Sequence, residues 1–156
     1  MIHSLFATNS SRGGTDLVRT PTFYVFKLFV PHHTRGAKWA PSDLSSETIN
    51  GNGRTFPVVT SGVTVNDDGQ VHVSLVNVDL VNTRDVTITL DSVAAGYVVE
   101  SAQVITGQAK DSFNDFGQGE AVNIQALPDA NYEICAKKLK ATLPSKSVVM
   151  LTLNSP

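Results

Sequence analysis

Short runs in which apolar and polar residues alternate, separated by turn residues, limit the possible folds of this chain more than any other feature. In 71–78 (VHVSLVNV), every second residue from Val71 to Leu75 is apolar, and His72 and Ser74 lie between them. Successive side chains of a β-strand point to opposite faces, so this pattern predicts a half-buried strand with His72 and Ser74 on its polar face.

Runs of this kind recur along most of the chain after residue 56, without an intervening helical period. Their spacing of about 8–12 residues is typical of all-β sandwiches and jelly rolls, and it argues against an alternating α/β fold. The sequence therefore predicts an all-β protein, an antiparallel β-sandwich or jelly roll. The expected strands cover 58–65, 71–78, 86–90, 97–106, 122–126, 138–143 and 148–153.

Turn residues between these runs predict how neighbouring strands pair. The Asp68-Gly69 pair favours a tight hairpin after 58–65, because glycine accepts the positive φ angles of such turns. We expect 71–78 and 86–90 to pair next to each other as a meander. We also expect 138–143 and 148–153 to form a hairpin across 144–146 (PSK), and 107–119 to be a loop.

One short N-terminal helix is expected over 20–31. Thr20 suits the N-cap, Pro21 suits the first helical position and Pro31 suits the end. Phe26 and its neighbours spread apolar side chains around most of the circumference, which predicts a helix buried on nearly all sides. Aromatic and β-branched residues are frequent here, so a strand is the alternative.

Length and charge exclude several classes of protein. The 156 residues carry 12 Lys and Arg against 14 Asp and Glu, which gives a net charge of −2. Such a chain lacks the basic field that attracts nucleic acid, and its apolar runs are shorter than the roughly 20 residues that span a bilayer. The first eight residues contain no Lys or Arg, so no export signal is recognised. We expect neither nucleic acid nor a membrane as a partner.

Residues that could bind a metal or perform nucleophilic chemistry are present but lack the required context. His32 and His33 are adjacent, and neighbours in an extended segment point to opposite sides, which does not suit a shared metal ion. The acidic stretches 67–68 and 111–115 resemble calcium ligands in composition only, and a hairpin turn and a solvated loop explain them more simply. Cys135, the single cysteine, is expected to be a small core residue. No metal and no cofactor are expected.

Glycoside hydrolysis needs two carboxylates that face each other across the bond, a pairing that sequence spacing cannot exclude. None of the four glutamates lies in an Asn-Glu pair or beside a tryptophan: Glu47, Glu100, Glu120 and Glu133. Three aromatic residues could stack on a sugar, namely Trp39, Tyr97 and Tyr132, although Trp39 is expected to pack under a loop or between layers. We therefore assign no catalytic residue.

Four segments together resemble one enzyme family. Residues 19–29 (RTPTFYVFKLF) are similar to the form L-T-P-T-Y-x-V-F-x-M-Y, which follows the last barrel strand in the α-L-arabinofuranosidases of glycoside hydrolase family 51. Residues 71–79 resemble that family's hydrophobic run ending in V-N-R/L-D, and 141–151 resemble its closing L-P-x-x-S-V-x-x-L segment. The opening residues 2–8 are similar to the family's end-of-barrel stretch. The resemblance thus covers nearly the whole chain.

This resemblance implies a β-sandwich that packs against a (β/α)8 barrel in the intact enzyme. Residues 1–40 would be the end of the barrel with a connecting helix, and 41–156 would be the C-terminal β-sandwich. The family hydrolyses terminal arabinofuranosyl groups of arabinan and arabinoxylan with retention, using two glutamates of barrel strands that have no counterpart here. The chain is then expected to be a non-catalytic accessory domain whose partner is the barrel. The parent enzyme is expected to be either cytoplasmic or secreted.

Two alternative functions and a tendency to self-associate are also considered. A carbohydrate-binding module would display two or more exposed aromatic residues on one sheet face. An unrelated interaction module would have residues 1–30 disordered and dispensable, whereas a barrel remnant should bury Phe23 and Phe26 against the sandwich. Exposed apolar surface favours self-association, so we also expect a homo-oligomer.

Overall fold

The computed structural model describes residues 4–9, 13–90 and 96–155, and it contains thirteen strands, one α-helix and two 3₁₀ helices in this part of the chain. In chain order these are β1 (Phe6–Thr8), β2 (Leu17–Arg19), α1 (Pro21–Phe29), η2 (Val30–His33), β3 (Lys38–Trp39), β4 (Thr48–Gly51), β5 (Arg54–Pro57), β6 (Val59–Val65), β7 (Val71–Asn77), β8 (Arg84–Thr89), β9 (Val98–Ile105), β10 (Gln125–Ala126), η3 (Asp129–Asn131), β11 (Tyr132–Cys135), β12 (Lys138–Leu143) and β13 (Ser147–Asn154).

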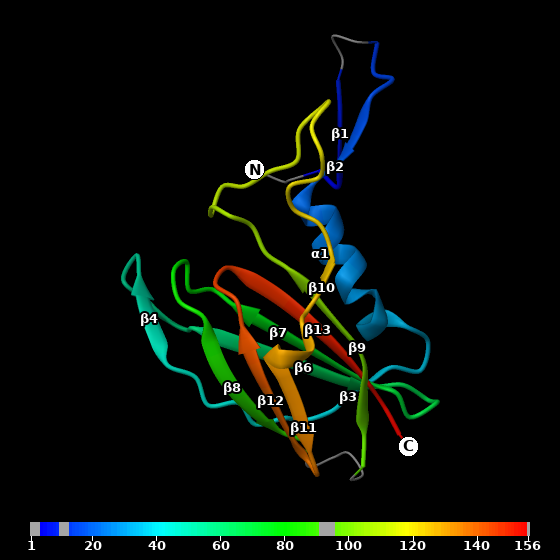
Figure 1. The fold of residues 1–156 in the computed structure, drawn as a ribbon, viewed down its shortest axis with the longest axis vertical. Coiled ribbons are helices and arrows are strands. Elements are labelled where there is room, and N and C mark those ends of the chain that lie inside the picture. Colours follow the sequence, from blue (N-terminus) through cyan, green and yellow to red (C-terminus); the bar gives the residue numbers. More distant parts are fainter. Residues whose placement is uncertain (1–3, 10–12, 91–95, 156) are drawn as a thin grey trace.

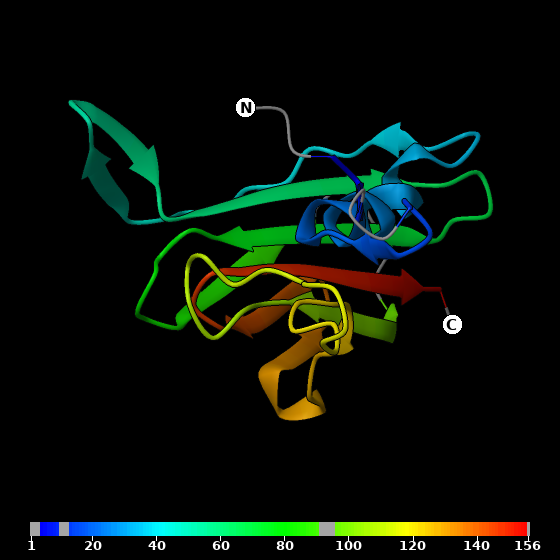
Figure 2. The same cartoon turned by 90° about the horizontal axis from the view of Figure 1, so that it is seen from above.

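Two antiparallel sheets form the body of the molecule (Figures 1 and 2). The larger sheet has the order β10-β9-β13-β7-β6-β3, and the smaller has the order β11-β12-β8. Two further hairpins, β1–β2 and β4–β5, form two-stranded sheets of their own. The all-β sandwich with one short N-terminal helix is thus confirmed.

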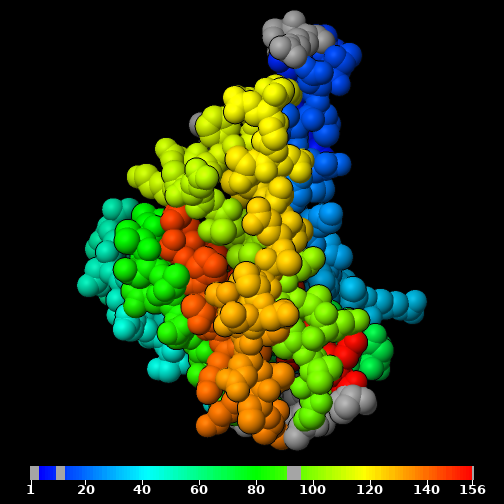
Figure 3. Space-filling model, viewed as in Figure 1, coloured from blue at the N-terminus to red at the C-terminus, as the bar shows by residue number. Residues whose placement is uncertain are grey.

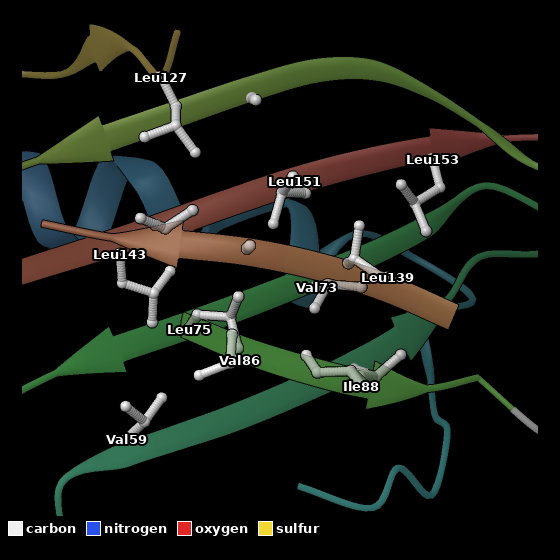
Figure 4. Close-up of a cluster of buried hydrophobic side chains, with 14 of the residues drawn as sticks. Val59, Val73, Leu75, Val86, Ile88, Leu127, Leu139, Leu143, Leu151 and Leu153 are labelled. Atoms are coloured by element: carbon white, nitrogen blue, oxygen red, sulfur yellow. The ribbon is translucent and has the colours of Figure 1, made fainter. Parts of the chain in front are cut away.

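Aliphatic side chains of both sheets meet between the layers (Figure 4). Val73, Leu75, Ile88, Leu139 and Leu151 are fully inaccessible to solvent. Burying a side chain of this size stabilises the folded state by about 1.5–3 kcal/mol. The alternating pattern in β7, β8, β12 and β13 therefore supplies the core, as the sequence predicts.

The expected hairpin between β12 and β13 is wrong. The two strands belong to different sheets, since β12 pairs with β8 and β11, whereas β13 pairs with β7 and β9. The Asn77 side chain fixes the connection by donating to the carbonyl oxygens of Pro144 (2.8 Å) and Asn82 (3.1 Å). Residues 144–146 thus carry the chain from one layer to the other instead of turning it within a sheet.

The expected meander of β7 and β8 is also wrong. β7 lies between β6 and β13, and β8 pairs with β12 in the other sheet. Asp79 shapes the connection, because its Oδ1 accepts from the backbone N–H groups of Val81 and Asn82, both at 2.9 Å. These contacts and the adjacent Arg84 lower the pKa of Asp79 well below its usual range. The connection is therefore a crossing between layers.

The helix has the predicted start but a different environment. The Thr20 side chain caps α1 and Pro21 is its first residue, while the chain continues past Pro31 as η2. Tyr24 and Leu28 are buried against the larger sheet, whereas Phe26 is 64% exposed and faces solvent. Burial on nearly all sides is thus wrong, and so is the burial of Phe26 against the sandwich.

Smaller differences concern strand lengths and the two extra hairpins. The expected strand over 122–126 is reduced to β10, and β1–β2 was not expected. The β4–β5 hairpin turns at Asn52 (φ 51°) and Gly53 (φ 72°), positive angles that suit the tight turn between two strands. None of the helices in the described ranges is long and apolar enough to cross a membrane.

Candidate functional site

Exposed apolar side chains gather at the end of the molecule where β1, β2 and the start of α1 lie. Figure 3 shows the loop before β10, drawn yellow-green to yellow, lying against this blue N-terminal segment. We call the set Leu5, Phe6, Leu17 and Phe113 the N-terminal surface, with exposed fractions between 38% and 66%. An apolar surface of this kind is typical of a protein–protein contact.

Thr20 joins the hairpin to the helix. Its hydroxyl lies 2.7 Å from the carbonyl oxygen of Ser4 and 3.4 Å from the backbone nitrogen of Phe23. Its backbone N–H donates to the carbonyl oxygen of Leu5 (3.0 Å). An N-cap hydroxyl satisfies a helix N–H that has no partner within the helix. One residue thereby fixes the direction of α1 relative to β1.

Asn114 ties the loop to the same junction. Its side-chain amide donates to the carbonyl oxygens of Arg19 (2.9 Å) and Val122 (2.8 Å), and its Oδ1 accepts from the Val122 N–H (2.8 Å). Asn114 is only 9% exposed, so these bonds form where unpaired polar groups are costly. The loop is thus held in place beside β2 by one buried amide.

Tyr24, Arg19 and Glu120 form a polar group beside the helix. Burial raises the pKa of Tyr24, and its hydrogen bond to Glu120 raises it further. Hydrogen bonds from Tyr24 and then from Arg19 lower the pKa of Glu120. Arg19 also lies over the ring of Phe23, 5.7 Å from its centroid, a distance at which a guanidinium is attracted to an aromatic face.

A pocket of about 690 Å³ lies between the β1–β2 hairpin, the start of α1 and the loop. Phe6 and Phe113 line it together with the hydroxyls of Ser4, Thr8 and Thr22. The apolar part of the lining also includes Ala7 and Pro21, so the pocket has a mixed character. Its lining can receive a segment of protein that offers both apolar side chains and hydrogen-bonding groups.

Histidines that the sequence singled out meet on the outer face of the larger sheet. His32 Nδ1 lies 2.8 Å from the Thr64 hydroxyl, and the rings of His32 and His72 are 6.4 Å apart. His72 is 3% exposed, so β7 is buried on both faces and the expected polar face is wrong. Burial, followed by the proximity of His72 and His33, lowers the pKa of His32 to about 4.

The Thr34 and Asn66 side chains show how the buried His72 is accommodated. Thr34 donates to Asn66 Oδ1 (3.0 Å), which leaves the Asn66 amide to donate to His72 Nε2 (3.0 Å). The other ring nitrogen, Nδ1, then carries the proton toward Thr152 (3.2 Å). His33 is exposed, so the adjacent pair points to different environments.

The four glutamates lie on separate elements. Glu47 precedes β4, Glu100 lies in β9, Glu120 lies in the loop before β10 and Glu133 lies in β11. Each is held by a different partner: Glu47 by Arg84, Glu100 by Gln70, Glu120 by Arg19 and Glu133 by Lys140. The structure therefore assigns these carboxylates to surface contacts of four different regions.

The two acidic stretches have structural roles. Gly69 closes the turn between β6 and β7 by donating its N–H to the Asn66 carbonyl (3.0 Å), as the Asp68-Gly69 pair predicts. In the second stretch, Asp115 accepts from the backbone N–H of Phe116 (2.7 Å). Among the described residues, no three His, Cys, Asp or Glu side chains are arranged to hold a metal ion.

Two expectations about single residues are wrong. Trp39 is 66% exposed on the short edge strand β3, and Cys135 is exposed on β11. Tyr97 and Tyr132 are partly buried, and their hydroxyls donate to Gly69 and Asp129 respectively. Trp39 lies on an edge strand of only two residues. Cys135 points away from the core because it alternates with Tyr132 and Ile134, which pack against the core.

Sequence reasoning missed the role of Asn114 and the second contact of Thr20. The acidic residues are the conspicuous feature of the stretch 111–115, and the partner of Asn114, Arg19, is 95 positions away. A signal for Thr20 was available, since Thr-Pro is typical of a helix start, and it predicted the cap but not the link to Ser4.

Comparison with known proteins places this arrangement among enzyme domains. Residues 4–147 match the family described as "Alpha-L-arabinofuranosidase C-terminal domain". An intracellular exo-α-L-arabinofuranosidase of Bacteroides ovatus is 32% identical over 139 residues, which are 88% of this chain and 26% of that protein. The chain thus spans about a quarter of the length of this curated relative.

Solved structures show the same fold. The GH51 arabinofuranosidase from Xanthomonas axonopodis pv. citri superposes with a TM-score of 0.82 at 26% identity, over 96% of this chain and 28% of that chain. The α-L-arabinofuranosidase from Thermotoga maritima, solved as an arabinose complex, superposes with a TM-score of 0.72 at 20% identity, over 94% of this chain and 30% of that chain.

Proposed function

The chain belongs to the family of α-L-arabinofuranosidase C-terminal domains, and we propose that it acts as the non-catalytic accessory domain of such an enzyme. Its role is to support the part of the polypeptide that performs hydrolysis. Residues 1–40 are assigned to the junction with that part and 41–156 to the sandwich, with β3 at the end of the first stretch adding an edge strand to the larger sheet. The parent enzyme would release terminal arabinofuranosyl groups with retention.

The N-terminal surface is the observation that carries this proposal. β1 and β2 are three residues each and pair only with each other in the described chain. A two-stranded hairpin is marginally stable in water, and exposing Phe6 and Leu17 makes it less so. Packing of a catalytic barrel on this surface would bury both side chains and fill the adjacent pocket.

The placement of the carboxylates favours a non-catalytic role for this chain. A retaining glycosidase holds its two carboxyl groups about 5–5.5 Å apart across the bond. Here each glutamate has its own partner on a different element. We assign no catalytic role to any residue of this chain.

The test replaces the matching quarter of the Bacteroides ovatus enzyme by this chain and measures hydrolysis of an aryl α-L-arabinofuranoside. The chimera is expected to be active, and the 156-residue chain alone is expected to release no product. In the chimera, Leu17→Asp should lower the thermal stability and the activity, whereas Lys110→Asp, on the same side but outside the apolar set, should change neither. Turnover by the chain alone that disappears on mutating a glutamate would overturn the proposal.

Carbohydrate binding is the alternative function, and the exposed Trp39 is the residue that favours it. Isothermal titration calorimetry of the chain with arabino-oligosaccharides separates the two. A binding heat that is measured for the unaltered chain and is absent for Trp39→Ala would assign a binding role to the larger sheet. If the unaltered chain gives no binding heat, the accessory role is the one that is retained.

A further inference from the structure

The β4–β5 hairpin extends from the sandwich as a separate two-stranded ribbon. Figure 2 shows it projecting past the ends of the other strands, and all the residues of its two strands are exposed. In the described part of the chain, these strands form a sheet of their own. Because an isolated two-stranded hairpin is marginally stable in water, we expect the ribbon to open locally far more often than the sandwich does.

Both Asn-Gly pairs of the sequence lie in this ribbon, in the run 50–54 (NGNGR). Asn50 and Gly51 are the last two residues of β4, whereas Asn52 and Gly53 form the turn between the strands. In an Asn-Gly pair, the asparagine side chain can react with the next backbone nitrogen, since glycine has no Cβ to obstruct the approach. The ribbon thus places two chemically equivalent pairs in different surroundings.

The first pair is held by its neighbours. The Thr55 hydroxyl donates to the side-chain oxygen of Asn50 (2.7 Å), and the two residues are cross-strand partners. Gly51 lies opposite Arg54, and the residues that flank a two-residue turn form a hydrogen-bonded pair. Both the side chain and the backbone nitrogen that would react with it are therefore engaged in the ladder.

The second pair lacks such contacts. Asn52 is exposed, and its side chain has no hydrogen-bond partner within the ranges that the structure describes. Asn52 and Gly53 have positive φ angles of 51° and 72°, and a Cβ placed on Gly53 would meet no atom within 4 Å. The space around the pair is thus open to water, and only the conformation of the tight turn opposes a reaction between the two residues.

We propose that Asn52 is a site of spontaneous deamidation, which proceeds when the ribbon opens. The backbone nitrogen of Gly53 loses its proton and attacks Cγ of Asn52, so that an N–Cγ bond forms, the Cγ–Nδ2 bond breaks and ammonia leaves. Water then opens the five-membered imide at either of its carbonyl carbons, which leaves aspartate or isoaspartate at position 52. One water is added and one ammonia is lost, and the step needs no oxidant, reductant or cofactor.

The products alter the ribbon in two ways. Either product introduces a carboxylate two positions before Arg54. Isoaspartate also routes the main chain through Cβ, and a two-residue turn cannot absorb the added carbon without losing its geometry. Ile49 and Phe56, which lie opposite each other and are 37% and 45% exposed, would then separate. The modification is thus expected to release β4 from β5 and to leave the sandwich intact.

Incubation of the 156-residue protein at pH 8.5, followed by peptide mass mapping, tests the proposal. Replacement of an amide by a carboxyl group raises the peptide mass, and isoaspartate is identified by its separate elution. Position 52 should convert at least about fivefold faster than position 50, the factor that one hydrogen bond contributes. Conversion should be slower at pH 6, because the attacking nitrogen must lose its proton. Equal conversion at the two positions, or none at position 52, would overturn the proposal.

Matched variants test the two structural causes. Asn52→Gln should remove most of the conversion, since its side chain would have to close a larger ring. Thr55→Val removes the hydroxyl that holds Asn50 and should raise conversion at position 50. Phe56→Ala weakens the ribbon and should speed conversion at position 52, whereas Leu17→Ala, on the N-terminal surface, should leave that rate unchanged. A rate at position 52 that Phe56→Ala does not change would contradict the requirement for opening of the ribbon.

Discussion

The sandwich and the N-terminal segment both contain large apolar side chains, which are buried in the sandwich and exposed in the N-terminal segment. In β7 and β13 the inward residues such as Leu75 and Leu151 are completely buried, because two sheets supply each other with a covering face. In β2 and α1, Leu17 and Phe26 remain 58% and 64% exposed. The inner faces of the two sheets thus cover each other, whereas the exposed residues of the N-terminal segment are the ones that the proposed contact with the rest of the enzyme would bury.

The largest expected effect is a difference in the free energy of unfolding when a leucine is replaced by alanine in each of the two regions. Leu75→Ala removes methyl groups from a closed core and should lower the free energy of unfolding by about 3 kcal/mol. Leu17→Ala should lower it by less than about 0.5 kcal/mol, since its side chain is mostly solvated in this chain. Urea denaturation measures both. Equal losses would show that the N-terminal segment is part of the same core.

A smaller effect is expected where the loop joins the two regions. Asn114→Ala removes three hydrogen bonds and leaves the buried Val122 N–H without its acceptor. We expect a loss of about 2 kcal/mol, which corresponds to a fall of roughly 4–8 °C in the thermal midpoint. The matched control Asn123→Ala removes one bond, to the Glu120 carbonyl, and should change the midpoint by much less. A midpoint for Asn114→Ala that matches the control would contradict the role of this amide.

An effect of similar size concerns pH and the attachment of η2 to the larger sheet. The pKa of His32 is about 4 in the folded chain and about 6.5 when unfolded. The unfolded chain therefore binds more protons between these values, so stability should fall as the pH is lowered from 6.5 to 4, by on the order of 2 kcal/mol.

The pKa of His72 is also lowered by burial, and the opposing charges of Asp68 and Glu100 reduce that shift. Chemical denaturation at pH 7, 5.5 and 4.5 should show a shallower decline for His32→Asn. The exposed neighbour provides a comparison, since His33→Gln removes only a minor cause of the lowered pKa of His32 and should change the slope far less than His32→Asn. An identical slope for all three proteins would show that His32 is not the group that titrates.

The sequence predicted those features that depend on adjacent residues. Alternation around Val73 and Leu75 gave the core face of β7, the Asp68-Gly69 pair gave the turn before it, and Thr20-Pro21 gave the start of α1. These signals act over a few residues, so a single segment contains all the information they need.

Features that depend on distant residues could not be predicted in the same way. Alternation predicts that β12 and β13 each have an apolar face, but it does not predict which strand lies beside each of them. The two strands belong to different sheets, and Asn77 holds the connection between them through its contact with Pro144. The exposure of Trp39 follows from its place on an edge strand, which only the strand order reveals. The contact of Asn114 with Arg19 spans 95 positions and has no local signal.

Amide hydrogen exchange tests most directly whether the N-terminal segment becomes stably structured only when the rest of the enzyme packs against it. The 156-residue chain is compared with the chimera that carries it on the Bacteroides ovatus enzyme. We predict that amides of β1, β2 and the first turn of α1 exchange rapidly in the chain alone and become protected in the chimera, while those of β7 and β13 are equally protected in both. Equal protection of the N-terminal segment in the two proteins would contradict the account.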